Sequence, residues 1–303
     1  MGEKIEAIYL GFGWEYVVMA TVSALSLKRY NPHIIISIVV NKDIILTPFL
    51  KEVFSRIVYV DEPDEYNRFY KTKIFDYIVG DKVIFLDSDT LIQGALDPIF
   101  YSLDRFDCAL TINPQPSGKK FAVSENIEGH DFPLWNSGVI FFRKSESVKS
   151  FFYAWHNKWL ESEKKNDMPP LAQAIYESPD LKILSLGLIW NASYGLMDYS
   201  KFLVKPKIWH YKFPDYDRTV CISLKEAANM YVSDKYQSQC VIENMKVVYN
   251  KYHLAGGYIF HTRFARSSIG KKIIYFACRL KLIPSLKKDG KYVGGKYDSI
   301  SRS

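Results

Sequence analysis

The sequence predicts an α/β protein with a largely parallel sheet, and three observations lead to this fold class. Strand-like and helix-like segments alternate three times within about the first 90 residues, which is typical of α/β units. The strand-like segments are continuous runs of β-branched and other apolar residues, as expected for strands buried on both faces. Of the 303 residues, 48% are hydrophobic and 24% are charged, a composition that excludes a disordered or fibrous chain.

The first part of the chain shows the alternation most clearly. Residues 5–10 predict a strand that ends at Gly11 and Gly13, and apolar residues at helical spacing over 15–29 predict a helix. The segments that follow are expected to be strands at 34–40 and 57–60, a helix at 73–79 and a strand at 82–86. Because parallel sheets bind ligands at the carboxyl ends of their strands, residues just after these strands are candidates for a site.

The middle of the chain continues this pattern. The predicted elements are strands at 108–112 and 138–142, helices at 146–160 and 171–176, and short strands near residues 183 and 208. After residue 212 helical segments dominate and basic residues accumulate. We therefore expect two regions, a first domain at residues 1–215 and a helical, basic C-terminal region at residues 216–303.

The charge of the chain is unevenly distributed. The whole chain has a net charge of +7, but residues 261–303 alone carry +9 and the first 260 residues carry −2. Apolar residues between 269 and 283 fall on one helical face beside basic residues, as in helices that lie on anionic membranes. Residues 263–296 are thus a candidate membrane contact, and a charged helix packed on the body is the alternative. Nucleic acid is not an expected partner, since no nucleic-acid-binding module accompanies the charge.

Simple patterns exclude other classes of protein. No apolar run approaches the roughly 20 residues that a membrane-spanning helix needs, and the amino terminus lacks the features of a signal peptide. The four cysteines include no close pair, so neither a zinc site nor a disulfide framework is indicated. The expected location is cytoplasmic, with a peripheral position on the inner face of the membrane as a variant.

The most informative segment is KVIFLDSDT, in which a buried strand leads directly into Asp87, Ser88 and Asp89. Two carboxylates one residue apart, at the turn after a strand, are able to bind one divalent cation, and oxygen ligands suit Mn²⁺ or Mg²⁺. Such a cation would neutralise a diphosphate. The alternative is that both side chains only stabilise the turn.

Three further segments add polar candidates to these two carboxylates. In LWNSGVIFFR, small polar residues lead into a second buried strand, where Asn136 offers donors and acceptors and Gly138 allows close approach of the backbone. Asp167 precedes two prolines at a helix start, where a carboxylate also serves as a cap. His210 follows a short apolar strand, and a structural role is its alternative.

Taken in order, these motifs resemble a known family. FYKTKIFDYIVGDKVIFLDSDTLI, then WNSGVIFFR, an Asp before a helix, LIWN and IWHYK are similar to the retaining glycosyltransferases of GT-A fold that include glycogenin and bacterial lipopolysaccharide galactosyltransferases. The resemblance covers residues 5–212. It implies a Rossmann-like, mostly parallel central sheet flanked by helices, which binds a nucleotide sugar in residues 1–215.

The resemblance also implies roles for individual residues. Mn²⁺, or Mg²⁺, would be held against the diphosphate of a UDP-sugar by Asp87, Asp89 and His210. The residues matching catalytic positions are Asp167, Asn136 and Lys71, with Lys73 as the alternative to Lys71. The residues matching positions that bind the nucleotide sugar are Leu10, Phe12, Tyr16, Lys71, Asp87, Ser88, Ser137, Gly138, Asn191 and Lys212, of which Leu10, Phe12 and Tyr16 would contact the uracil.

The sequence departs from the family pattern at two places. The family's Asp-Gln pair is here Asp167-Met168, and the nearest glutamine is Gln173, so the usual nucleophile or stabiliser is missing from its position. After His210 no glycine appears before Pro214, and Lys212 is the substitute we expect for the family's diphosphate-binding lysine.

The expected function is therefore metal-dependent transfer of a hexose from a UDP-sugar to an acceptor hydroxyl, with retention. The bacterial relatives act on lipid-linked acceptors, so the expected setting is surface glycan synthesis: lipopolysaccharide, capsule or lipid-linked oligosaccharide. One alternative is a membrane-surface protein of the same fold that binds a nucleotide sugar without turnover. Another is a nucleotidyltransferase, although the Gly-rich amino-terminal loop of those enzymes is absent.

Overall fold

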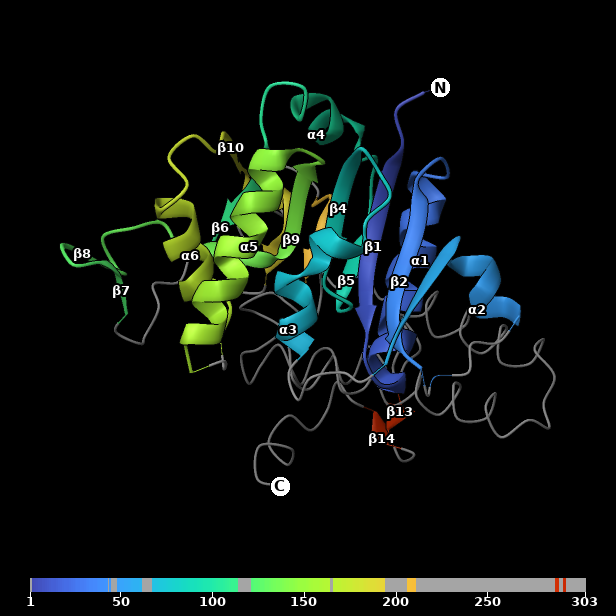
Figure 1. Cartoon of the computed structure of the whole chain (residues 1–303). Helices are drawn as coiled ribbons and strands as arrows, with labels where there is room; N and C mark the ends of the chain where they lie inside the picture. Colours follow the sequence, from blue (N-terminus) through green and yellow to red (C-terminus); the bar gives the residue numbers. More distant parts are fainter. Residues whose placement is uncertain are drawn as a thin grey trace.

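A seven-stranded sheet with helices on both faces forms the body of the protein (Figure 1). The computed structural model describes residues 2–42, 44, 48–61, 67–113, 121–163, 166–193, 206–210, 287–288 and 291–292. The predicted fold class, an α/β protein with a mostly parallel central sheet, is confirmed. Lys212 and the predicted helix at 269–283 lie outside the described residues. In the C-terminal region the structure describes only a short hairpin of β13 (Lys287–Lys288) and β14 (Lys291–Tyr292).

The strand order in the large sheet is β10-β6-β9-β4-β1-β2-β3. In chain order these strands are β1 (Ile5–Gly11), β2 (Ile35–Asn41), β3 (Arg56–Val60), β4 (Lys82–Leu86), β6 (Cys108–Ile112), β9 (Trp135–Arg143) and β10 (Ile183–Leu186). Six of them are parallel to one another, and β9 is antiparallel to its neighbours β4 and β6. The amino end of β9 therefore lies at the carboxyl edge of the sheet, beside the end of β4.

Helices cover both faces of this sheet because its strands are apolar on both sides. In chain order the helices are α1 (Trp14–Tyr30), α2 (Pro48–Val53), α3 (Asn67–Thr72), η1 (Ile74–Tyr77), α4 (Asp97–Ser102), α5 (Glu146–Glu161), α6 (Met168–Tyr176) and η2 (Leu188–Trp190). In Figure 1, α3, α5 and α6 lie in front of the sheet. Among the described helices none is long and apolar enough to cross a membrane.

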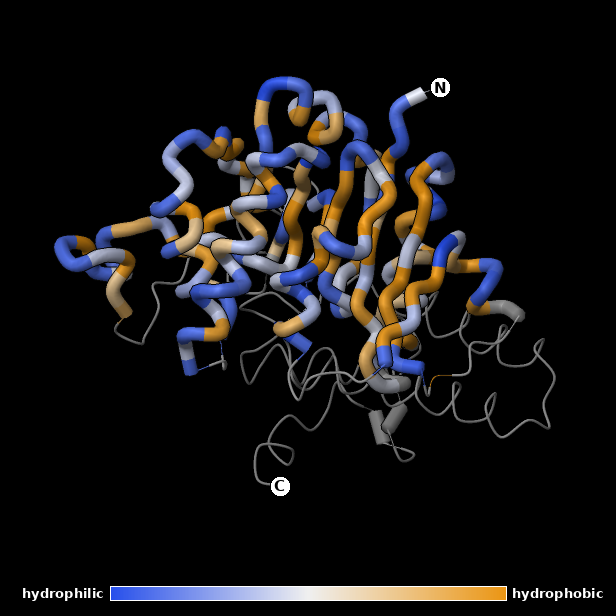
Figure 2. Tube along the Cα trace, in the orientation of Figure 1, coloured by the Kyte–Doolittle hydropathy of each residue, from blue (hydrophilic) through white to orange (hydrophobic). Residues whose placement is uncertain are grey.

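The alternation of side chains along each strand divides the core into two apolar layers. In β4, Ile84 and Leu86 pack in the layer that contains α1, whereas Val83 and Phe85 pack in the layer that contains α5. Figure 2 shows that hydrophobic residues follow one another along these strands, and polar residues gather in the loops. Burial on both faces explains why the strands read as continuous apolar runs in the sequence.

A second, three-stranded sheet has the order β11-β12-β5 and lies close to the end of β4. Its strands are β5 (Thr90–Ile92), β11 (Ala192–Ser193) and β12 (Ile208–His210). Since β5 begins directly after Asp89, this small sheet brings the last described segment of the body next to the turn that follows β4.

Two local predictions need correction, and one further element was not predicted. The helix expected at 73–79 is instead α3 followed by η1, a break at Lys73 that ends one helix and begins the next. Asn136, Ser137 and Gly138 lie inside β9 and not in a turn before it, because pairing with β4 and β6 extends the strand. A small hairpin, β7 (Ala122–Ser124) and β8 (Ile127–Glu128), was not expected, and it packs on α6 in a separate apolar cluster.

Candidate functional site

The turn after β4 holds Asp87, Ser88 and Asp89 in a fixed conformation. The Asp87 backbone N–H donates to the Gly138 carbonyl of β9 at 2.8 Å, and the Thr90 hydroxyl donates to the Asp87 carbonyl at 2.8 Å. The Ser88 hydroxyl donates to the Leu10 carbonyl at 2.9 Å, which ties the turn to the end of β1. Both aspartate side chains remain about 30% exposed, so a ligand can reach them.

A chain of buried hydroxyl groups supports this turn from below. Tyr9 Oη lies 3.1 Å from Ser23 Oγ, and Ser23 Oγ lies 2.7 Å from Thr90 Oγ1. The Thr90 hydroxyl already donates its proton to the Asp87 carbonyl, so it accepts the hydrogen bond from Ser23. The Ser23 hydroxyl in turn accepts the hydrogen bond from Tyr9. Three elements, β1, α1 and β5, thereby fix the backbone at Asp87.

The small sheet places His210 beside the two carboxylates. In the antiparallel pairing of β12 with β5, His210 is opposite Thr90, and its Nε2 lies 3.2 Å from Asp89 Oδ1 and 3.7 Å from Asp87 Oδ2. The His210 ring is buried. Burial raises the pKa of the Asp89 carboxyl, but the charge of His210 and its hydrogen bond outweigh burial and hold this pKa below its usual value.

Gly138 makes room for this arrangement. A Cβ added there would lie 2.1 Å from His210 Cε1 and 2.7 Å from Asp87 Oδ2, far inside van der Waals contact. The sequence predicted close approach of the Gly138 backbone to a ligand. That approach stays a prediction, and the structure shows that the missing side chain also lets an imidazole and a carboxylate approach the strand.

These groups fit a divalent cation. Asp87, Asp89 and His210 each offer one ligand atom, and the three atoms lie within 4.8 Å of one another. Two carboxylate oxygens and one imidazole nitrogen form a donor set that suits Mn²⁺, and Mg²⁺ less well because it prefers oxygen. The close packing of His210 and Asp87 against Gly138 keeps two of the donors in place.

Lys71 lies next to this cluster and joins it to Asp167. Its Nζ is 2.9 Å from Asp87 Oδ1 and 3.2 Å from Asp167 Oδ2, and the ammonium lies over the Phe85 ring. Burial lowers the pKa of Lys71, but the charges of Asp167 and Asp87 outweigh burial and raise it above the usual value. Lys73, the alternative in the sequence, pairs with Asp76 outside this group.

Asp167 is a buried acid held by cations. Its carboxylate pairs with Lys71 and lies 3.5 Å from Arg68 Nε, and Ser137 forms a hydrogen bond with it. Burial raises the pKa of Asp167, whereas Lys71, Ser137 and Arg68 lower it, and the net effect is a pKa below the usual value. The capping alternative is wrong for its side chain, which accepts no capping hydrogen bond from α6.

The two residues that could replace the missing glutamine are directed elsewhere. Met168 packs in the apolar cluster under the β7–β8 hairpin, and Gln173 donates to the Ala122 carbonyl of that hairpin at 2.7 Å. Neither side chain therefore stands beside Asp167 as a second polar group.

Asn136 and Asn191 are buried near the cluster, but each already uses its oxygen. Asn136 Oδ1 accepts from the Gly138 backbone N–H at 2.9 Å, and Asn191 Oδ1 lies 2.9 Å from His210 Nδ1. The Asn191 Nδ2 atom is buried and has no hydrogen-bond partner among the described residues. Asn191 was predicted as a contact of the nucleotide sugar, and its contact with His210 was not predicted.

The loop after β1 lies at the same edge of the sheet. Leu10 and Phe12 are buried, with the Phe12 ring 4.6 Å from the Tyr70 ring between centroids, whereas Tyr16 is exposed at the start of α1. Phe12 thus reaches α3 through Tyr70, and Leu10 reaches the metal cluster through the hydrogen bond that its carbonyl accepts from Ser88.

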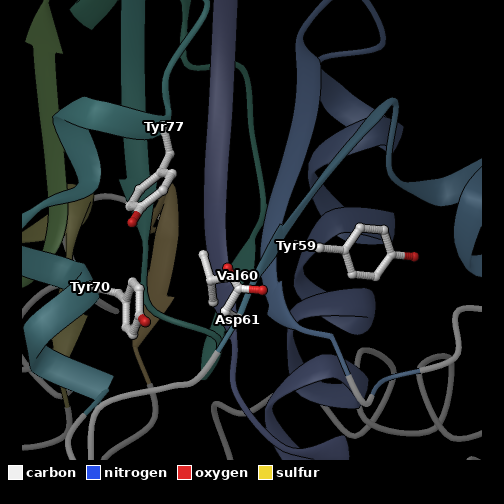
Figure 3. Close-up of a pocket in the computed structure, with 5 residues that line it drawn as sticks. All are labelled: Tyr59, Val60, Asp61, Tyr70 and Tyr77. Atoms are coloured by element: carbon white, nitrogen blue, oxygen red, sulfur yellow. The ribbon is translucent and has the colours of Figure 1, made fainter.

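A cavity of about 660 Å³ adjoins this loop and is lined by residues that sequence reasoning missed. Tyr70 and Tyr77 face it from α3 and η1, and Val60 and Asp61 line it from the end of β3, whereas the ring of Tyr59 points away (Figure 3). Asp61 follows the predicted strand that is now β3, and this position after a strand was a usable signal, as it was for Asp87.

The sequence of this chain matches a family model described as Glycosyl transferase family 8 over residues 59–214. No curated protein sequence matches the chain significantly. The matched region includes Lys71, Asp87, Asp89, Asp167 and His210.

Several solved structures share the fold. The galactosyltransferase LgtC, solved with donor and acceptor sugar analogs, has a TM-score of 0.51 and 15% identity, with 79% of this chain and 99% of that chain covered. The glycosyltransferase GlyE of Streptococcus pneumoniae has a TM-score of 0.52 and 16% identity, with 82% and 63% covered. The bifunctional glycosyltransferase WbbM has a TM-score of 0.50 and 17% identity, with 81% of this chain and 52% of that chain covered. At these identities the similarity establishes the fold, an LgtC-like GT-A fold.

Proposed function

The chain belongs to glycosyl transferase family 8, and we propose that it transfers a hexose from a UDP-sugar to an acceptor hydroxyl with retention of configuration. The family makes the protein a glycosyltransferase that uses a nucleotide-sugar donor and an acceptor. The donor's identity, the stereochemistry and the biological pathway are our proposal.

One observation carries the proposal. At the carboxyl edge of the sheet, the cluster Asp87, Asp89 and His210 lies next to a buried lysine, Lys71, that also contacts Asp167. A nucleoside diphosphate leaving an anomeric carbon needs positive charge at the phosphate and polar groups around the sugar. This arrangement supplies both within one contiguous site.

Asp87, Asp89 and His210 would hold Mn²⁺ or Mg²⁺, which when bound supplies positive charge to the diphosphate. Lys71 adds a second positive charge from the chain itself. Its raised pKa keeps the ammonium protonated near neutral pH, and its pairing with Asp87 and Asp167 fixes its position between the metal cluster and the sugar site. Lys71 is therefore the residue we assign to the leaving phosphate, with Lys212 as a second candidate.

The sugar and the uracil would bind on either side of this lysine. Three consecutive residues of β9 lie at the turn that holds Asp87: Asn136, Ser137 and Gly138. Asp167 lies on the other side of Lys71 from Asp87. These positions support contacts of the four residues with the donor sugar. The buried Nδ2 of Asn191, without a partner among the described residues, supports a hydrogen bond to the donor as well. Leu10, Phe12 and Tyr16 are assigned to the nucleoside end because they lie at or just after the end of β1, and Ser88 because its hydroxyl donates to the Leu10 carbonyl.

Retention would follow from attack of the acceptor hydroxyl on the face from which the diphosphate leaves, with the leaving phosphate taking the proton. Met168 and Gln173 offer no nucleophile beside Asp167, and the Asp167 carboxylate is engaged by Lys71 and Arg68. This mechanism is tested by the anomeric configuration of the product, observed by NMR during the reaction. An inverted product would contradict it.

We propose surface glycan synthesis on a lipid-linked acceptor as the setting, with residues 1–215 as the catalytic domain and 216–303 as a basic membrane-facing region. The net charge of +9 over residues 261–303 supports this assignment. Deletion of the residues after Arg266 should abolish binding to anionic vesicles at low salt while neutral vesicles bind neither form. Equal partitioning of both forms would contradict the membrane role.

The enzymatic proposal is tested by UDP release from a panel of UDP-sugars, with and without Mn²⁺. Wild type should release UDP from at least one donor in a metal-dependent way, and Asp89→Asn should not. Binding of a nucleotide sugar without release, even with acceptors supplied, would indicate a binding protein. Release of pyrophosphate from a sugar phosphate and a nucleoside triphosphate would indicate a nucleotidyltransferase.

A further inference from the structure

Asn191 is the second polar neighbour of His210, and the small sheet fixes both residues together. Asn191 directly precedes β11, which pairs in parallel with β12 so that Ser193 is opposite His210. The pairing of β12 with β5 then sets His210 beside Asp89. One three-stranded sheet therefore determines where the amide, the imidazole and the carboxylate lie relative to one another.

The hydrogen bond between the two side chains has a defined direction. An amide oxygen only accepts hydrogen bonds, so Asn191 Oδ1, 2.9 Å from His210 Nδ1, requires the proton on Nδ1. The Nε2 atom, on the other side of the ring, is the one that faces Asp89 and Asp87. A histidine ligand needs a lone pair on the ligating nitrogen, and a hydrogen bond from the other nitrogen fixes both tautomer and ring orientation.

We infer that Asn191 is a positioning residue for the metal site, acting through His210: it accepts the Nδ1–H hydrogen bond and holds the ring plane, so that Nε2 is the nitrogen available to the metal. The inference rests on the proposed function only in so far as that function requires the metal. Both residues are 3% exposed, so water does not replace the amide oxygen when it is removed. Loss of the amide would free the ring to turn and would leave Nδ1 without its buried acceptor.

The experiment measures Mn²⁺ binding to the full chain without any sugar, using the EPR signal of free Mn²⁺. Asn191→Leu has a similar volume and no acceptor, and it should raise the Mn²⁺ dissociation constant about 10- to 100-fold. Asn191→Asp keeps an acceptor oxygen for Nδ1, so its dissociation constant should stay within about threefold of wild type or fall, in keeping with the stronger basicity that a carboxylate partner gives a ligating histidine. Rescue by the aspartate distinguishes hydrogen-bond acceptance from side-chain volume.

A matched control and a second readout guard against general damage to the fold. Asn31 is also buried and also hydrogen-bonded, to Leu96 and Gly94 far from the cluster, and Asn31→Leu should leave Mn²⁺ affinity unchanged even where it lowers stability. In the Zn²⁺-loaded protein, ¹⁵N NMR of labelled histidine should show Nδ1 protonated and Nε2 bound to metal in wild type. Asn191→Leu should lose this pattern, with His210→Gln used to assign the signals.

Unchanged Mn²⁺ affinity in Asn191→Leu, or equally weakened affinity in Asn191→Asp and Asn191→Leu, would overturn the inference. Failure of wild type to bind Mn²⁺ would also overturn it. The proposed transferase activity fails separately, since wild type that binds Mn²⁺ in the predicted way but releases UDP from no donor would contradict that function and leave the role of Asn191 intact.

Discussion

The two edges of the seven-stranded sheet, at the amino and the carboxyl ends of its strands, both carry acids that are at least half buried, but they hold them in different ways. At the amino edge, Glu6 accepts hydrogen bonds from the Val79 and Gly80 backbone N–H groups at 2.6 and 2.7 Å and from the Ser37 hydroxyl at 2.5 Å. Asp107 at the same edge accepts two from the Arg143 guanidinium and one from the Lys182 backbone N–H. Arg56 also lies 3.5 Å from Glu6 Oε1, so both oxygens of each acid have donors of their own.

At the carboxyl edge, three acids share two side-chain partners. Lys71 is divided between Asp87 and Asp167, and His210 is divided between Asp87 and Asp89. Three carboxylates close together with shared partners keep acceptor capacity that a cation or a sugar hydroxyl is able to use. The comparison teaches that burial of an acid does not by itself identify a ligand site. Carboxylates that share too few hydrogen-bond donors do identify one.

The largest effect should follow from removing one carboxylate at the carboxyl edge. Asp89→Asn should raise the Mn²⁺ dissociation constant by more than about a hundredfold, since loss of an outer partner alone costs 10- to 100-fold. Its free energy of unfolding should change by about 1 kcal/mol or less, because the pair with His210 is partly exposed. Mn²⁺ titration and urea unfolding measure the two. A stability loss larger than the affinity loss would place Asp89 among the structural acids.

A slightly smaller effect is expected when the space beside His210 is filled. Gly138→Ala should push the ring away from the carboxylates and weaken Mn²⁺ binding about 10- to 100-fold. Gly187→Ala is the matched control, because a Cβ there meets nothing within 4 Å and its φ of −64° suits alanine. Equal Mn²⁺ affinity in the two variants would show that the strand and ring move apart without cost.

The amino edge should respond in the opposite way. In Glu6→Gln the amide oxygen can still accept from the Val79 and Gly80 N–H groups, but the NH2 group then faces the Ser37 hydroxyl and the Arg56 guanidinium. The free energy of unfolding in urea should therefore fall by about 1–3 kcal/mol. Mn²⁺ affinity of the folded protein should not change. Glu52→Gln, at an exposed position, is the control. If the Glu6 variant has the same free energy of unfolding as this control, Glu6 is not a structural acid and the proposed difference between the two edges is wrong.

The smallest effect tests the hydroxyl chain beneath the metal turn. Ser23→Ala interrupts the path from Tyr9 to Thr90 and should lower the free energy of unfolding by about 1 kcal/mol. Ser102→Ala, whose hydroxyl donates to the Pro98 carbonyl on an exposed helix, should cost less. An equal loss in the free energy of unfolding in both variants would show that the buried hydroxyl chain contributes no more than a single hydrogen bond on α4.

The sequence alone determined the fold class and two of the three candidate metal ligands, Asp87 and Asp89. Strands buried on both faces need continuous apolar runs, so β1, β2 and β4 were predicted within a residue or two. Asp87 and Asp89 were predictable because their spacing and their position after β4 are local features. Lys71, and the role of His210 as a metal ligand, entered only through family resemblance, since nothing in their immediate surroundings distinguishes them from structural residues.

Only the tertiary structure decided which distant side chains meet. The antiparallel course of β9 put Gly138 under His210, and the small sheet joined Asn191, His210 and Asp89. The structure also shows that Lys71, and not Lys73, lies beside the cluster. It shows that the Asp167 carboxylate pairs with Lys71 and Arg68 and does not cap a helix. The physical reason is that these contacts join segments far apart in the chain. Strand register places Gly138 and His210, and the packing of α3 and α6 on the sheet places Lys71 and Asp167.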